Sequence, residues 1–213
     1  MHGNLAALQA VLVDARRAGF TRGAITGDLV TRGLHPEEVV HAVRALGWPC
    51  VEGNTDRRLV DTPRLADHRK ARRAGGRRWT RLRVSNASLS FLAELPGTCT
   101  LRVGDARVLV AHEGPDGPGR LLGDDPSPAT VAAQAERHGV DALVVGHTHR
   151  PLLVRADGAL LMNPGSVGEG TPEDRRPSWG WLAWEGGRLT AGLKRVERPL
   201  AAVRQQPPGG GEG

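Results

Sequence analysis

The stretch Asp141-Ala-Leu-Val-Val-Gly-His-Thr-His149 constrains the fold of this chain more than any other. Residues 143–145 are a short apolar, mostly β-branched run, which is typical of a strand buried on both faces. Gly146 allows a tight turn, and His147 and His149 follow where a parallel strand would end. Ligands of open α/β sheets bind at that end, and neutral imidazole is a common metal ligand. Taken alone, the pattern also fits a polar turn whose histidines only form hydrogen bonds.

The first quarter of the chain alternates helix and strand patterns. A helix is predicted over residues 5–18 with Asn4 as its N-cap, and a second is predicted to open at His35-Pro36. Short strands are predicted at residues 23–25 and 49–51. The polar clusters Thr26-Gly27-Asp28 and Gly53-Asn54-Thr55-Asp56 follow them. This order predicts parallel strands joined by crossover helices.

The rest of the chain predicts further elements of one domain that spans residues 1–200. Helices are expected to begin at Ser85 and at Ser127-Pro128. Strands are expected at residues 98–103, 107–111, 143–145, 152–155, 159–162, 181–184 and 189–196. Residues 201–213 form a Pro/Gly tail that is too poor in apolar residues to fold, and we expect it to be disordered.

Composition adds constraints on compartment and partners. The net charge is +6, and much of it lies in Arg69–Arg73 and Arg77-Arg78. These residues predict either a solvated surface or a phosphate-binding patch. Cys50 and Cys99 are far apart and have no metal-ligand spacing, so we expect buried thiols in a reducing compartment. The sequence has no run of eighteen apolar residues and no signal peptide, which predicts a cytoplasmic protein that does not associate with membranes.

Polar residues follow the predicted strands in a recognisable order: Met1-His2-Gly3-Asn4, Gly27-Asp28, Gly53-Asn54-Thr55-Asp56, His112 and Gly146-His147-Thr148-His149. This order resembles the calcineurin-like metallophosphoesterases, whose pattern is D-x-H, G-D, G-N-H-D, H and G-H-x-H. It looks most like the small bacterial phosphodiesterase branch, in which a loop like Asn163-Pro164-Gly165-Ser166 also occurs. The resemblance extends to about residue 196. It implies a four-layer α/β/β/α sandwich of mixed sheets.

The resemblance also implies a site for two divalent metal ions. His2, Asp28 and His149 would complete the first metal position, and Asp28 would bridge to a second position with Asn54, His112 and His147. Asp28, Asn54 and His112 would be the catalytic residues. The implied reaction is hydrolysis of a phosphodiester or phosphomonoester by a metal-bridging hydroxide. Imidazole, carboxylate and amide ligands favour manganese, with iron, zinc, nickel or magnesium as alternatives.

Two departures from the family pattern affect these expectations. His2 stands in the D-x-H element, but its aspartate would lie directly before Met1. We therefore expect the first strand to be missing here, and the codons upstream of Met1 to encode a short apolar strand that ends in this aspartate. Thr55 replaces the histidine of G-N-H-D, which serves as a general acid in the family, so the chain should prefer activated leaving groups. Asp56 should orient Asn54 or its loop, and Thr148 should point away from the metals.

The sequence also leaves other functions open. The same fold could serve as a catalytically impaired scaffold or regulatory protein, although the retained ligand residues favour an enzyme. The basic stretch suggests a nuclease or weak, non-specific nucleic-acid binding. A protein phosphatase would need a large peptide groove, for which 213 residues leave little room. The expected partner is a small phosphoester substrate, and self-association of this chain is also open.

Overall fold

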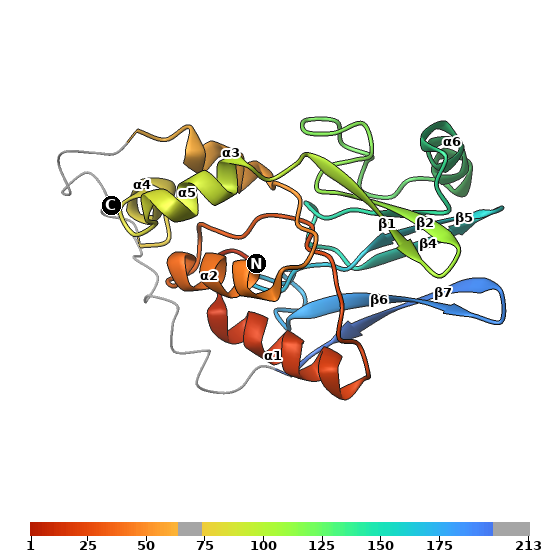
Figure 1. Ribbon diagram of the computed structural model, residues 1–213, viewed down its shortest axis with the longest axis horizontal. Coiled ribbons are helices and arrows are strands. Elements are labelled where there is room, and N and C mark those ends of the chain that lie inside the picture. Colours follow the sequence, from red (N-terminus) through yellow and green to blue (C-terminus); the bar gives the residue numbers. More distant parts are fainter. Residues whose placement is uncertain (64–73, 198–213) are drawn as a thin grey trace.

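The computed structural model describes residues 1–63 and 74–197, and its helices and strands are arranged in layers (Figure 1). The predicted tail 201–213 and the basic run Arg69–Arg73 lie outside the described residues. The helices are α1 (Leu5–Arg17), α2 (Pro36–Leu46), α3 (Asn54–Val60), α4 (Arg77–Arg81), α5 (Asn86–Ala93) and α6 (Pro128–His138). The strands are β1 (Thr98–Val103), β2 (Ala106–Ala111), β3 (Ala142–Val144), β4 (Leu152–Ala156), β5 (Ala159–Asn163), β6 (Ser178–Glu185) and β7 (Arg188–Arg195).

A mixed five-stranded sheet with the order β1-β2-β3-β5-β4 forms the centre of the molecule. The three inner strands β2, β3 and β5 run parallel, and the edge strands β1 and β4 are antiparallel to their neighbours. All three residues of β3 are buried, as expected for an apolar strand covered on both faces. The carboxyl ends of β2 and β3 therefore lie side by side, and polar residues follow each of them.

Four layers stack in the order helix, sheet, sheet, helix (Figure 1). Helix α6 packs its Val131 and Ala135 against one face of the five-stranded sheet. The β6–β7 pair covers the opposite face, where Met162 packs near Leu193. Helix α1 then covers β6 on the outside, with Ala15 packed in a cluster around Trp179. The predicted α/β/β/α sandwich is confirmed; its five-stranded sheet is mixed, whereas β6 and β7 form an antiparallel pair.

Local capping signals place most helices where the sequence predicts them. The Asn4 side chain accepts from the Ala7 amide at 3.1 Å and begins α1. Ser85 and Ser127 cap α5 and α6 in the same way, and Pro36 opens α2. These devices satisfy backbone N–H groups that have no partner inside the helix.

Some predicted elements differ from the structure. The strands expected at residues 23–25 and 49–51 are reduced to a single parallel bridge between Ile25 and Cys50. Sequence propensity cannot supply the hydrogen bonds of a ladder, which depend on neighbouring strands. Helix α3 begins within the polar cluster that follows Cys50, because Gly53 takes the N-cap position and Asp56 the third helical position.

A cavity of about 680 Å³ lies between the Ile25 bridge and β6. Apolar side chains line most of it, including Val11, Val110 and Trp181. The Met1 ammonium and the His2 amide both donate to the Asp28 carbonyl, at 2.6 and 2.8 Å. The first residues thus lie alongside Asp28, and Met1 itself lines this cavity.

We predict that an apolar, β-branched segment of about five residues fused before Met1 raises the melting temperature by about 5 °C or more. It would bury aliphatic side chains in the cavity. It would also replace the buried Met1 ammonium, whose pKa is lowered by burial, with an amide that makes the same hydrogen bond without a charge. Calorimetry checks this, with a Gly/Ser segment of equal length as control. Equal melting temperatures for the two fusions would contradict it.

Candidate metal centre

The polar residues that follow the strands meet at one end of the sheets. His112 comes directly after β2, and His147 and His149 follow β3 in the next turn. Asp28 follows the Ile25 bridge, and Asn54 is the first residue of α3. These are the strand-end positions from which parallel α/β sheets present ligands. His2, just before α1, completes the group predicted from the sequence.

Two glycines allow the turns around Asp28 and Asn54 to approach each other closely. A Cβ atom on Gly53 would lie 2.1 Å from the Asp28 amide nitrogen and 2.2 Å from its Oδ1. A Cβ on Gly27, which has a φ of +83°, would lie 2.5 Å from the Gly53 nitrogen. Any side chain at either position would force the two turns apart.

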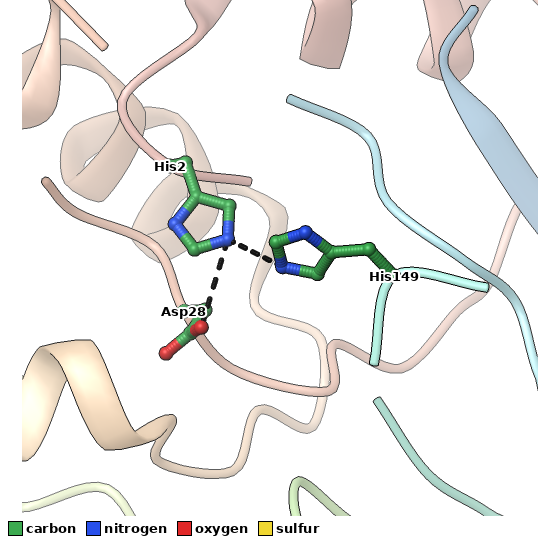
Figure 2. Close-up of side chains that lie close together, drawn as sticks. All are labelled: His2, Asp28 and His149. Atoms are coloured by element: carbon green, nitrogen blue, oxygen red, sulfur yellow. Dashed lines mark hydrogen bonds and ion pairs between the residues drawn. The ribbon is translucent and has the colours of Figure 1, made fainter. Parts of the chain in front are cut away.

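His2, Asp28 and His149 form the first cluster of the site (Figure 2). The Nε2 atoms of the two histidines are 2.8 Å apart, and His2 Nε2 lies 3.6 Å from Asp28 Oδ2. One ligand atom from each residue lies within 4.8 Å of the other two. His2 and Asp28 are buried, whereas His149 is partly exposed.

The second cluster approaches the same carboxylate oxygen of Asp28. His112 Nε2 is 3.5 Å from Asp28 Oδ2 and 3.1 Å from Asn54 Oδ1. His147 Nδ1 approaches the same His112 nitrogen at 3.4 Å. Among the six predicted ligand residues, Asp28 is therefore the one that contacts both clusters, and the structure brings all six together.

In the second cluster, the position of the proton on His112 leaves hydrogen-bond acceptor atoms facing one another. His112 Nδ1 lies 2.6 Å from the Thr26 carbonyl oxygen and must donate to it, which leaves Nε2 of the neutral ring as a lone pair. That lone pair faces a carboxylate oxygen and an amide oxygen. Because three acceptors at this range repel one another, a cation fits between them. The donor set of imidazole, carboxylate and amide oxygen suits a divalent transition metal.

The electrostatics of the site keep the ligands in the forms that bind metals. Burial lowers the pKa of His112 and His149, and lowers that of His2 well below its usual value. These rings are therefore neutral at neutral pH. Burial opposes ionisation of Asp28, but in acid the positive charges of protonated His112 and His2, with the Thr55 amide, outweigh it and lower its pKa to about 2, so Asp28 is ionised at neutral pH. Metal binding needs neutral imidazole and ionised carboxylate.

Backbone strain is concentrated at this site. Among the described residues, the non-glycine positions with positive φ are His2, Asp28, Thr31, Arg32, His147 and His149. Four of these are predicted ligands. Each such conformation costs on the order of 1–3 kcal/mol, and such residues cluster at active sites and ligand clamps.

Several residues that hold the ligands were not assigned a role from the sequence. Asn163 donates to the Gly146 carbonyl at 2.7 Å and to Thr148 Oγ1 at 3.0 Å, which fixes the turn that carries both histidines. Glu169 Oε2 lies 3.4 Å from His149 Nδ1. The Asn163-Pro164-Gly165-Ser166 loop was noticed as a family feature, but nothing in the sequence singled out Glu169.

Asp56 is fully buried and holds the loop that carries Asn54. Its carboxylate accepts from the amides of Leu29 and Val30 at 2.9 and 3.2 Å, and from that of Gly53 at 3.0 Å. Burial, with Asp28 nearby, raises the pKa of Asp56 to about 7. The three amides tie the Asp28 turn to the start of α3.

Comparison with known proteins identifies the family of the chain. The sequence profile of the calcineurin-like phosphoesterase superfamily domain matches residues 1–183. The chain belongs to this superfamily. It is 30% identical over 169 residues to the uncharacterized protein MJ0912 of Methanocaldococcus jannaschii, covering 78% of this chain and 67% of that protein.

Solved structures share the fold. A metallophosphoesterase from Sphaerobacter thermophilus superposes with a TM-score of 0.75 at 28% identity, covering 96% of this chain and 94% of that one. The hypothetical protein PH1004 from Pyrococcus horikoshii OT3 gives a TM-score of 0.74 at 20% identity, with 95% and 87% coverage, and supports the fold alone. Within the described residues, no helix has the length and apolar character that a membrane span requires.

Proposed function

We propose that this phosphoesterase hydrolyses a phosphodiester or phosphomonoester at a centre of two divalent metal ions, with manganese as the preferred metal. The observation that carries the proposal is the position of Asp28, whose Oδ2 lies about equally far from His2 Nε2 (3.6 Å) and His112 Nε2 (3.5 Å). A carboxylate between two groups of imidazoles is suited to bridge two cations.

His2, Asp28 and His149 would hold one ion, and Asp28, Asn54, His112 and His147 the other. When bound, such ions supply Lewis acidity toward water and neutralise charge on phosphoryl oxygens. The chain's own contribution is to fix the donors. Thr26 holds the tautomer of His112, and Asn163 holds the turn that carries His147 and His149.

Thr55 stands where the family has a histidine that serves as a general acid. The Thr55 hydroxyl is already hydrogen-bonded. It donates to Asp28 Oδ1 at 2.8 Å, with the Val30 carbonyl as a second acceptor at 3.3 Å. Thr55 therefore orients Asp28 and is a poor proton donor toward a leaving group. The proposed enzyme acts best on esters whose leaving groups need little protonation.

A second function, nucleic-acid hydrolysis or binding, has weaker support. Of the basic stretch, Arg77 lies beside the site and the run Arg69–Arg73 is outside the described residues. We propose at most weak, non-specific binding that falls as salt rises. If the chain served only as a scaffold with this fold, the backbone strain at its ligand residues would have no functional reason.

Substitution of Asp28 by alanine should reduce manganese-dependent hydrolysis of bis-p-nitrophenyl phosphate by more than about 100-fold, because it removes the ligand common to both metal positions. Steady-state rates with added manganese measure this. The matched control is Asp105→Ala, at an exposed turn between β1 and β2, which should keep its activity. Full metal-dependent activity in Asp28→Ala would show that the site assignment is wrong.

The rate should depend steeply on the pKa of the leaving group, with nitrophenyl esters cleaved well and alkyl esters poorly. Thr55→His should flatten this dependence by supplying a general acid, whereas Thr55→Val, which has a similar shape and no proton to donate, should keep it steep. A plot of log kcat/KM against leaving-group pKa measures the slope for each variant. If the unmodified chain already gave a flat plot, another residue would have to donate the proton.

A further inference from the structure

A polar cavity of about 550 Å³ adjoins the metal centre on the side of α3 and α4. It touches the centre at two points: Thr55, which donates to Asp28, and Glu169, which lies 3.4 Å from His149. Its walls are formed by residues from four parts of the chain, namely Thr31, Arg32, Thr55, Arg58, Ala74, Gly75, Gly76, Arg77 and Glu169.

The cavity carries a surplus of positive charge. Arg32 forms an ion pair with Glu169, so these two charges offset each other. Arg58 and Arg77 are exposed, and neither has an ion pair within the described part of the chain. Two guanidinium groups without a carboxylate partner match the charge of a phosphomonoester dianion, and guanidinium binds phosphate oxygens through paired N–H groups.

Backbone contacts hold the wall of the cavity near these arginines in place. Thr31 and Arg32 both have positive φ, and the Arg32 amide donates to the Gly75 carbonyl at 2.6 Å. A Cβ on Gly75 would lie only 2.3 Å from the Arg32 carbonyl oxygen, so glycine is needed for this contact. The Thr31 hydroxyl is buried and has no hydrogen-bond partner among the described residues. Strained backbone with an unsatisfied hydroxyl is expected where a ligand binds.

We propose that this cavity binds a second phosphate group of the substrate. The substrate class is then a phosphoester that carries a separate phosphomonoester, as in a nucleotide phosphorylated at both its 3′ and 5′ positions. The inference rests on the proposed function, which places the reacting phosphoryl group at the metal centre. Binding of a phosphate group in the cavity can be measured separately.

The test compares two substrates that differ by one phosphate: thymidine 5′-(p-nitrophenyl phosphate) and the same compound with a 3′-phosphate. With manganese at low salt, the 3′-phosphate should lower KM by about tenfold in the unmodified chain. In Arg77→Gln the ratio of the two KM values should fall toward one. Arg78→Gln is the matched control, because Arg78 neighbours Arg77 on α4 and both line an adjacent pocket beside Asp61, but Arg78 does not line this cavity. It should keep the ratio.

A second readout needs no catalysis. Calorimetric titration of metal-free protein with thymidine 3′-phosphate should give binding that weakens with salt and weakens in Arg77→Gln but not in Arg78→Gln. If neither substrate is hydrolysed while this binding difference persists, the cavity assignment stands and the proposed function fails. If both substrates are hydrolysed with equal KM, or if Arg77→Gln and Arg78→Gln bind the nucleotide equally, the inference is overturned.

Discussion

The close approach of the Gly27–Asp28 turn to the Gly53–Asn54 turn is the contact on which the rest of the site depends. Only residues without a Cβ allow it, since a side chain on Gly53 would meet the Asp28 backbone at 2.1 Å. Asp56 then ties both turns together through three backbone amides. The result is a buried carboxylate in a fixed position between two groups of histidines.

The fixed position of the Asp28 carboxylate explains why the chain retains an arrangement of ligand residues that costs free energy by itself. His2, Asp28, His147 and His149 all adopt strained backbone conformations, and acceptor atoms of Asp28, Asn54 and His112 face one another. A cation held by the same atoms would offset these costs, because it would convert the repulsion among acceptors into ligation.

The sequence predicted what depends on local signals. The caps at Asn4, Ser85 and Ser127 and the buried strand before His147 were all found where expected, because each rests on neighbouring residues. The ligand set came from the order of motifs in a known family, not from spacing alone. His2 and His149 lie 147 positions apart, and no local pattern could pair them.

What the sequence did not predict depends on contacts between distant segments. The expected strands at residues 23–25 and 49–51 shrink to one bridge because ladder hydrogen bonds require neighbouring strands. Glu169 was missed because it reaches His149 and Arg32 only through the fold. The polar cavity was missed for the same reason: the arginines of the basic stretch resembled a solvated surface, and only tertiary structure shows that Arg77 lines this cavity and Arg78 does not.

If Asp28 lies between two metal positions, anomalous diffraction from crystals soaked in manganese should show this most directly. Two peaks about 3.5–4 Å apart are expected. Both should lie within bonding distance of the Asp28 carboxylate, one beside His2 and His149 and the other beside Asn54, His112 and His147. Manganese peaks elsewhere in the molecule, with none in contact with Asp28, would contradict this position of Asp28.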